Sequence, residues 1–438
     1  MSATPGLILA APSSGSGKTT IALGLMRALA RRGVRVAAAK AGPDYIDPGF
    51  HRVATGRPCL NLDPWAMQAQ TRAGLASELG IDADLIVCEG VMGLFDGIDA
   101  AGTGSSATLA AETGWPVLLA VDAKGLAASF GPLVAGFAAA DPAVRIAGAI
   151  ANRTGGTRHV ELLRQALAKR RPDVQFLGGI GRDAGLALPE RHLGLVPAGE
   201  TPDLERVVEL AADACTAALD LDAIVRLARP TRLAAAPPAT LLAPLGQHIA
   251  VACDAAFAFA YPAQLAAWRR QGAEVSFFSP LADQKPAVGA DAVFLPGGYP
   301  ELHAGKIASA SCFVAALRAF AGFVYGECGG YMVLGDGLTD ADGTRHAMLG
   351  LLPVETTFAK RKLHLGYRKV RLRADLPFGR AGMSFRGHEF HYSTILAENR
   401  PERLFDPCDA AGHALESCGA RRGNVAGSYI HLIDQDGP

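Results

Sequence analysis

The 438-residue sequence lacks an excess of charge of one sign, a long hydrophobic run and clustered cysteines. Lys plus Arg balances Asp plus Glu at 42 each, which argues against a broad electrostatic grip on nucleic acid or an anionic membrane. No apolar stretch reaches the roughly 18 residues of a membrane-spanning helix. The apolar run near the N-terminus is short and has no basic segment before it, unlike a signal peptide. We therefore expect small-molecule partners, with no nucleic acid and no membrane.

The eight cysteines are scattered without the spacing of a metal site, and several lie inside apolar runs. This distribution predicts reduced thiols and a cytoplasmic protein. The chain is long for one domain and half of its residues are apolar, so we expect two or three domains with sizeable cores.

Apolar runs of strand length alternate with helical segments through the first half of the chain. Runs such as GLILAAP, DLIVCEG and RIAGAIANR are typical of buried strands, and TTIALGLMRALARRG has helical periodicity. This alternation predicts a mostly parallel sheet with helices on both faces. Prolines then mark a linker, after which strand-like runs resume. The predicted fold class is α/β, with two open, mostly parallel domains at 1–229 and 247–438, joined by a linker at 230–246.

The segment APSSGSGKTT, residues 11–20, follows a predicted strand and opens a helix. Its glycines let the backbone bend around phosphates, Lys18 can reach the β and γ phosphates, and Thr19 can ligate Mg²⁺. The alternative is a helix cap that binds nothing, and Pro12 stands where a P-loop usually has its first glycine. We predict an ATP-binding P-loop made of Ser14, Gly15, Ser16, Gly17, Lys18, Thr19 and Thr20.

Other polar residues follow the predicted strands, at the edge where ligands of an open α/β sheet gather. Glu89 ends DLIVCEG and is predicted to be a Mg²⁺ ligand, whereas Asn152 ends GAIANR and is predicted to read the adenine edge of ATP. The alternatives are that Glu89 only caps the next element and that Asn152 only makes a turn.

The loop KAGPDYIDPGFH, residues 40–51, is dense in chemistry. Asp44 and Asp47 lie three residues apart, and EGVMGLFDG adds Asp96 on what should be a neighbouring loop. The alternative is that these aspartates are merely turn formers. Because all three follow strands of one sheet, we predict a shared site in which they hold metal and a reaction intermediate, with Asp47 among the metal ligands.

The stretch GFVYGECGGYMVLG places Cys328 where a strand should give way to a helix. Small residues two before and two after the cysteine allow a sharp turn that lifts the thiol above the sheet. His431, in NVAGSYIHLID, is the predicted proton acceptor, and backbone N–H groups of Gly297, Gly298 and Gly329 are the predicted oxyanion hole. The alternative is an inert core cysteine and a structural histidine.

These motifs carry a family resemblance that covers essentially the whole chain. GECGG with GSYIH resembles the nucleophile and histidine segments of class I glutamine amidotransferases of the cobyrinate and cobyric acid synthase type. APSSGSGKTT, GPDYIDPGFH, GLFDG and GHEFHYS resemble the cobyrinate or hydrogenobyrinate a,c-diamide synthase family. The resemblance implies a dethiobiotin-synthetase-like P-loop domain fused to a glutaminase domain.

The resemblance also implies a reaction, in which the a and c carboxylates of hydrogenobyrinate or cobyrinate are amidated with ATP, Mg²⁺ and L-glutamine. In this scheme Tyr45 and Ile46 lie where they could contact the macrocycle. Most amidotransferases of the class have an acid two residues after the histidine, but Ile433 stands there, so the group that orients His431 is left open. Glu389 of GHEFHYS is one conceivable substitute.

Two rival functions are weighed beside this one. Cobyric acid synthase amidates other side chains of the corrin ring, and a P-loop regulatory ATPase would carry a non-catalytic C-terminal domain. The regulatory ATPase leaves the Cys328 turn and His431 unexplained. The order of the two amidations and the presence of cobalt in the ring are open, and a homodimer is plausible for an isolated synthase.

Overall fold

The computed structural model describes residues 4–191, 194–399 and 402–437. The chain folds into two compact units, here called the N-terminal unit (residues 1–65 and 69–239) and the C-terminal unit (residues 66–68 and 240–438). The division between residues 239 and 240 falls inside the linker predicted for 230–246. Each unit contains its own parallel sheet, which confirms the predicted α/β class.

A parallel sheet of order β3-β2-β4-β1-β5-β6-β7 forms the centre of the N-terminal unit. Its central strand β1 is apolar and almost entirely buried, as expected for a strand covered on both faces. The strands of the unit are β1 Pro5–Ala10, β2 Val36–Ala41, β3 Leu60–Leu62, β4 Leu85–Glu89, β5 Val117–Asp122, β6 Ile146–Thr154, β7 Gln175–Gly181, the pair β8 Glu190–Arg191 and β9 Gly194–Leu195, and β10 Arg229–Pro230.

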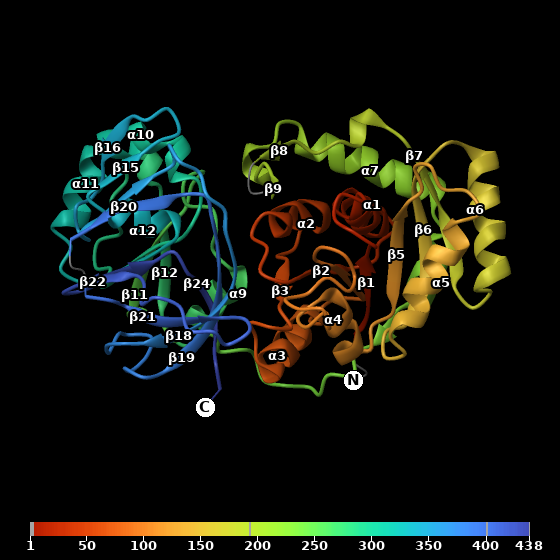
Figure 1. Cartoon of the computed structure of the whole chain (residues 1–438), viewed down its shortest axis with the longest axis horizontal. Helices are drawn as coiled ribbons and strands as arrows, with labels where there is room; N and C mark the ends of the chain where they lie inside the picture. The colour runs from red at the N-terminus through yellow and green to blue at the C-terminus, as the bar shows by residue number, and fades with distance from the viewer. Residues whose placement is uncertain (1–3, 192–193, 400–401, 438) are drawn as a thin grey trace. The chain divides into compact units, whose positions relative to one another are not determined.

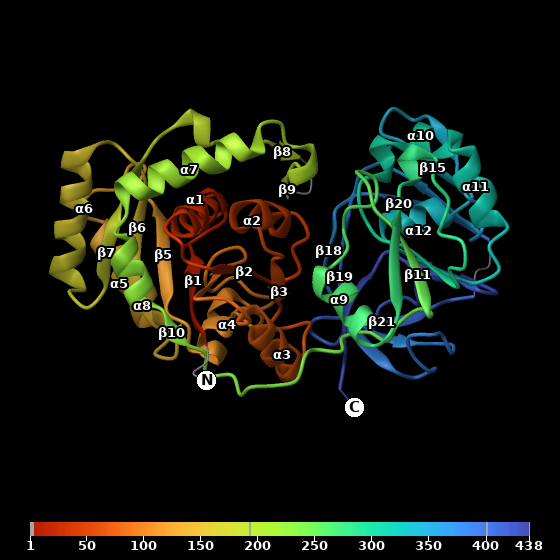
Figure 2. The ribbon, with the colours of Figure 1, turned by 180° about the vertical axis from the view of Figure 1, so that it is seen from behind.

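Helices cover both faces of this sheet (Figure 1). Figure 1 shows α5 and α6 side by side on one face, while α1 and α7 pack together on the other face (Figure 2). The helices are α1 Lys18–Arg31, α2 Asp47–Thr55, α3 Ala69–Leu79, α4 Ser106–Thr113, α5 Phe130–Ala140, α6 Thr157–Arg170, α7 Leu204–Ala218 and α8 Leu221–Leu227, with short 3-10 turns η1 Ala184–Leu186 and η2 Ala198–Glu200.

The first part of the predicted linker is bound to the N-terminal unit rather than free. Strand β10 pairs antiparallel with β1, with Pro5 opposite Pro230. The Arg232 N–H then donates to the Thr113 carbonyl over 2.7 Å. The proline content of 230–246 indicated the absence of regular structure, but it carried no information about this docking.

The C-terminal unit is built on a six-stranded sheet of order β12-β11-β13-β14-β23-β22, parallel except for its last pair. Its helices and 3-10 turns are α9 Pro262–Arg270, η3 Pro280–Ala282, η4 Pro300–Leu302, α10 Ala304–Ser309, α11 Ser311–Arg318 and α12 Gly329–Leu334. Its strands are β11 His248–Ala252, β12 Glu274–Phe278, β13 Ala292–Leu295, β14 Phe323–Glu327, β15 Gly337–Thr339, β16 Arg345–Ala347, β17 Val354–Thr357, β18 His364–Leu372, β19 Ser384–His391, β20 Thr394–Glu398, β21 Phe405–Asp409, β22 Ala420–Arg422, β23 Val425–Ser428 and β24 His431–Gln435.

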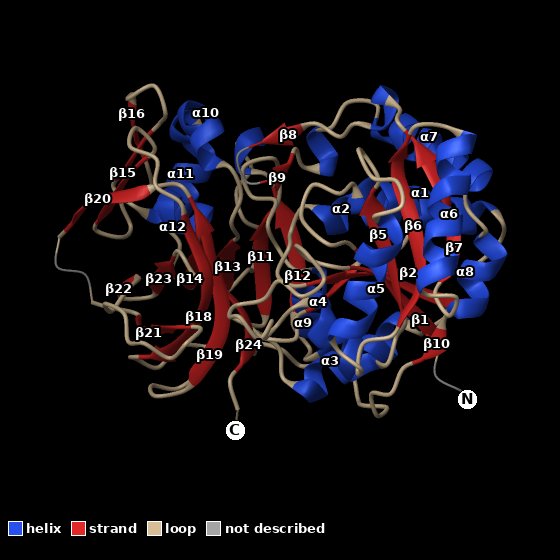
Figure 3. Cartoon of the chain, turned by 45° about the vertical axis from the view of Figure 1, so that its right-hand side comes forward, coloured by secondary structure: helices blue, strands red, loops and turns tan. Residues whose placement is uncertain are grey.

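Two further four-stranded sheets complete this unit (Figure 3). One has the order β16-β15-β17-β20, and the other is the antiparallel sheet β21-β18-β19-β24. The apolar runs of the sequence predicted the parallel sheet but not these two. Strand β18 explains why: six of its nine residues are charged, polar or glycine, so it lacks the apolar run by which the buried strands were recognised.

Candidate functional site

The P-loop of the N-terminal unit lies between β1 and α1. Gly17 caps α1 with a φ of 83°, a left-handed conformation that glycine adopts without strain. An added Cβ there would lie 2.3 Å from Nδ2 of Asn152, so a larger residue would also collide with the neighbouring strand. The helix N-terminus therefore opens onto the loop, where its unpaired N–H groups can bind an anion.

Lys18 is buried at the start of this helix, only 8% exposed. Its Nζ donates to the Met92 carbonyl over 2.7 Å. Burial lowers the pKa of Lys18, and the nearby Glu89 carboxylate acts in the opposite direction. A desolvated ammonium of this kind has few competing partners, which suits it to bind phosphate oxygens.

Glu89, at the end of β4, is fully buried and has a partner on each oxygen. The Thr19 hydroxyl donates to Oε1 and His51 Nε2 lies beside Oε2, both at 2.7 Å. Burial opposes ionisation of Glu89, but Lys40 and His51 outweigh it and hold its pKa below the ordinary value. The structure thus brings Thr19 and Glu89, both predicted to ligate Mg²⁺, into direct contact.

Lys40, which the sequence analysis left without a role, lies at the centre of this charge network. Its Nζ is 2.6 Å from Asp47 Oδ2, 3.3 Å from Glu89 Oε1 and 3.8 Å from Asp44 Oδ2. The side chain is almost completely buried, yet these carboxylates outweigh desolvation and raise its pKa well above the ordinary value. Lys40 ends the apolar run VRVAAAK, and a lysine in a buried run was the available signal.

The loop after β2 contains Asp44, Tyr45 and Ile46, and the structure gives each of them a different environment. Asp44 Oδ1 accepts the N–H groups of Ile46 and Asp47 at 2.8 and 3.1 Å, so it shapes the entry to α2. Tyr45 is partly exposed, whereas Ile46 is buried. Ile46 therefore packs inside the protein, and of the two residues Tyr45 has more surface for a ligand.

Asp96 lies on the loop after β4 and forms a turn, because its Oδ2 accepts the Gly93 N–H over 2.9 Å. Its charge still acts on Lys18. Asp96 therefore both forms a turn and acts on the charge of Lys18. These two roles were alternatives when only the sequence was considered.

A cavity of about 650 Å³ adjoins the P-loop within the N-terminal unit. Lys18, Thr19 and Thr20 are among the residues that line it, together with Asn152, Arg153 and most of the segment 180–188. Asn152 Nδ2 donates to the Ser16 carbonyl over 2.8 Å, which braces the loop. This bond uses one of the two Nδ2 hydrogens, and the contact of Asn152 with adenine stays a prediction.

Cys328 occupies the turn between β14 and α12 in the C-terminal unit. Its backbone has φ 46° and ψ −102°, a strained conformation for a residue with a side chain. Its N–H donates to the Ser428 carbonyl over 2.8 Å, which ties the turn to the end of β23. Burial and then Glu301 raise the pKa of the thiol, whereas a hydrogen bond from the Gly329 N–H lowers it. The resting group is a thiol that needs a base.

His431, the first residue of β24, lies next to Gly297, and so does this cysteine. A Cβ added to Gly297 would be 2.4 Å from His431 Cε1, 3.2 Å from His431 Nε2 and 3.4 Å from Cys328 Cβ. Only glycine leaves room for the imidazole here, because any side chain at position 297 would occupy the space that His431 and Cys328 both border. The structure thus brings together two residues that are 103 positions apart in the sequence.

The predicted oxyanion-hole glycines surround the same turn. A Cβ added to Gly329 would lie 3.0 Å from the Gly298 nitrogen, so the two backbone segments are in contact beside Cys328. Gly329 also begins α12, where backbone N–H groups lack intrahelical partners. The oxyanion-hole role of these glycines stays a prediction.

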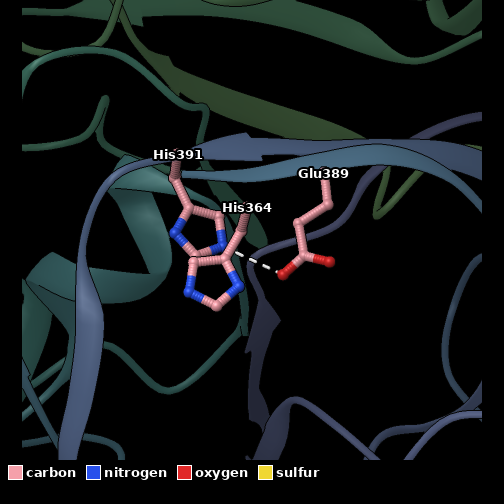
Figure 4. A group of neighbouring side chains, drawn as sticks. All are labelled: His364, Glu389 and His391. Carbon is pink, nitrogen blue, oxygen red and sulfur yellow. Dashed lines mark hydrogen bonds and ion pairs between the residues drawn. The ribbon is translucent and has the colours of Figure 1, made fainter. Parts of the chain in front are cut away.

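Among the described residues, one group combines donors typical of a transition-metal site: His364, Glu389 and His391 (Figure 4), whose ligand atoms lie within 4.8 Å of one another. Glu389 is already paired, through Oε1 with His391 Nε2 at 2.9 Å and through Oε2 with Arg368 at 2.8 Å. The two imidazole rings stack nearly parallel, with centroids 4.8 Å apart, so their nitrogen lone pairs do not converge on one point. We interpret the group as an ion-pair cluster.

Comparison with known proteins assigns a separate domain family to each of the two sites, the P-loop and the Cys328 turn. Residues 7–196 match the model of the CobQ/CobB/MinD/ParA nucleotide binding domain, and residues 248–437 match that of the CobB/CobQ-like glutamine amidotransferase domain. The chain is thus a P-loop protein with a glutamine amidotransferase domain.

Full-length relatives narrow the assignment. The chain is 54% identical over 432 residues to hydrogenobyrinate a,c-diamide synthase of Rhizobium meliloti (strain 1021), covering 98% of this chain and 99% of the relative. It is 52% identical over 435 residues to the protein of the same name from Brucella anthropi, covering 98% of each. The chain belongs to the hydrogenobyrinate a,c-diamide synthase family, and the predicted resemblance is confirmed.

The helices of the described residues include none with the length and apolar character needed to cross a membrane.

Proposed function

We propose that this protein uses ATP and L-glutamine to amidate the a and c carboxylates of hydrogenobyrinate, or of its cobalt-containing counterpart cobyrinate. The observation that carries the proposal is the pairing, in one chain, of a P-loop beside a buried charge network with a strained cysteine beside a buried histidine. The name shared by relatives that match the full chain supports the ring substrate.

A carboxylate resists attack by ammonia because its oxygen leaves poorly. ATP would first convert it to an acyl phosphate at the N-terminal unit, where Lys18 would exchange the Met92 carbonyl for phosphate oxygens. Asp44 and Asp96 would shape the loops around the intermediate, and Tyr45 would contact the macrocycle. The cavity beside the P-loop is large enough for a nucleotide.

The residues around Thr19 fit a magnesium ion, since its hydroxyl and the Glu89 carboxylate are neighbouring hard oxygen ligands. Lys40 contacts both Glu89 and Asp47, and so keeps the Asp47 carboxylate within the proposed set. When bound, Mg²⁺ neutralises charge on the phosphates.

The C-terminal unit would supply the ammonia. His431 would take the thiol proton as Cys328 Sγ attacks the side-chain amide carbon of glutamine, and the N–H groups near Gly298 and Gly329 would stabilise the resulting oxyanion. The proton would then pass to the departing nitrogen, leaving a thioester that water hydrolyses to glutamate.

The setting and assembly are part of the proposal. All eight cysteines are free thiols, which supports a reducing, cytoplasmic environment. A homodimer is the assembly that we would test first, by sedimentation velocity.

The decisive experiment supplies purified protein with hydrogenobyrinate or cobyrinate, together with ATP, Mg²⁺ and glutamine, and counts new amides by mass spectrometry. We expect two amides, at the a and c positions. Amidation of other side chains would instead assign the protein to the cobyric acid synthase type. ATP turnover that needs no carboxylic acid, without glutamine cleavage, would favour a regulatory ATPase.

A further inference from the structure

His431 has no acid at the position where other glutamine amidotransferases of its class carry one. Ile433 stands there, buried and apolar. The carboxylate of the candidate Glu389 is engaged by His391, two residues further along β19, and by Arg368 of β18. A carboxylate for the histidine therefore has to come from a different strand.

Glu327 lies at the end of β14, directly before Cys328, and its carboxylate is directed to the start of β24. Its side chain is 6% exposed, and its Oε1 accepts the Leu432 N–H over 3.1 Å. This bond fixes the carboxylate next to the backbone of the residue that follows His431. The second oxygen, Oε2, then lies 3.7 Å from His431 Nδ1.

The Nε2 edge of the imidazole lies near the nucleophile. A Cβ on Gly297 would lie 2.4 Å from His431 Cε1, 3.2 Å from His431 Nε2 and 3.4 Å from Cys328 Cβ, so Nε2 and the cysteine border the same point next to Gly297. One ring nitrogen is thus near a buried carboxylate and the other is near the nucleophile, the arrangement that a proton-shuttling histidine requires.

Other groups also face the ring. His388, from β19, stacks on His431 with centroids 4.9 Å apart and accepts or donates a hydrogen bond with Tyr261 at 3.1 Å. Burial, and then His431, hold the pKa of His388 well below its ordinary value, so it stays neutral. Glu301 and Glu389 act electrostatically on Cys328. Of these groups, Glu327 is the carboxylate found next to His431 Nδ1.

We propose that Glu327 is the positioning residue for His431, an inference that rests on the proposed glutaminase role of Cys328 and His431. In the glutamine-bound state Glu327 Oε2 accepts the His431 Nδ1–H, which keeps the lone pair on Nε2 for the thiol proton. The 3.7 Å separation closes when glutamine is bound, because catalytic hydrogen bonds are often long in the free enzyme. The carboxylate then stabilises the imidazolium until its Nε2 proton passes to the departing ammonia as the thioester forms.

The test compares Glu327→Gln, Glu327→Asp and the wild type. Glutamine retains an oxygen for the Leu432 N–H but loses the charge. We expect the glutaminase kcat of Glu327→Gln to fall roughly 100-fold, and the acid limb of its kcat/KM profile to move to lower pH, because the imidazole loses its anionic neighbour. Glu327→Asp should recover at least about tenfold of that loss. Synthesis from added ammonia should stay within about twofold of the wild type, which reports that each variant is folded.

A matched control is Glu398→Gln, which removes a half-buried carboxylate of the same unit that pairs with Arg403 at 2.6 Å. It should leave the glutaminase profile unchanged. For any variant that loses ammonia-dependent synthesis, the rate of Cys328 alkylation by iodoacetamide against pH gives a second readout within the C-terminal unit.

The inference would be overturned if Glu327→Gln kept the wild-type glutaminase kcat and the acid limb of its kcat/KM profile stayed at the wild-type pH. It would also be overturned if the glutaminase kcat of Glu327→Asp were no higher than that of Glu327→Gln. Neither result touches the proposed function. That proposal would instead fall if Cys328→Ala kept its glutamine-dependent synthesis.

Discussion

The two sites of this chain solve different electrostatic problems. The N-terminal unit surrounds Lys40 with Asp44, Asp47 and Glu89, so that a buried cation and several carboxylates balance one another. The site of the C-terminal unit has a neutral thiol in a strained turn with a histidine beside it. Moving phosphoryl charge requires many fixed charges, whereas attack by a thiol requires exposure of one atom and one base.

Removing the Cys328 thiol is the change with the largest expected effect on the difference between the two units. Cys328→Ala should lower glutamine-dependent amidation by about 1,000-fold or more, because no thioester can form. Amidation from added ammonia should be retained, since the N-terminal unit is intact. The measurement is product mass with each nitrogen source, and loss of both activities would contradict the division of labour between the units.

Lys18→Ala is the converse change. It removes the buried ammonium at the head of α1, so amidation from either nitrogen source should fall roughly 100- to 1,000-fold. Glutamine hydrolysis should persist, as followed by glutamate release. Unimpaired synthesis from ammonia would refute the phosphate role of Lys18.

Lys40→Met tests whether the charges of the N-terminal unit depend on their central cation. The change leaves Asp47 and Glu89 buried without it and should destabilise the unit by roughly 3–5 kcal/mol in urea unfolding. Arg164→Met, which breaks the exposed pair with Glu161, is the control and should leave the midpoint unchanged. A midpoint for Lys40→Met equal to that of the control would contradict the network.

Glu389→Gln tests the ion-pair cluster of the C-terminal unit. Burial opposes ionisation of Glu389, but His391 and Arg368 outweigh it and hold its pKa at about 2, against 4.5 when unperturbed. A depressed pKa contributes stability above the unfolded value, and that contribution disappears as the pH falls from 4.5 toward 2.

The variant should therefore be roughly 2 kcal/mol less stable than the wild type at neutral pH, with the difference shrinking in acid. Unfolding by denaturant at pH 7, 4 and 3 measures this. A difference that is constant with pH would mean that Glu389 acts through packing rather than charge.

Residues that follow buried strands were predictable from the sequence. Glu89 ends an apolar run, and parallel strands carry such residues to one edge of the sheet, so its meeting with Thr19 was expected. Cys328 was identified by the glycines around it, because only small neighbours permit the turn. Apolar runs also predicted the two parallel sheets.

Residues whose role depends on distant partners were missed. Lys40 and His51 both contact Glu89, which lies 49 and 38 positions further along the chain. Nothing in the sequence around either residue indicates that contact. Strands such as β18, which are polar along much of their length, lack the apolar pattern that marks a buried strand.

By itself, the sequence determined which residues could bend, bind phosphate or attack: the glycines of the P-loop, Lys18 and the thiol of Cys328. These properties are local, because they depend on backbone freedom and side-chain chemistry within a few residues. Only the tertiary structure decided what stands beside each of them. Glu327 approaches His431 because β14 ends where β24 begins, and a distance of 3.7 Å between residues 104 positions apart is fixed by packing rather than by any pattern along the chain.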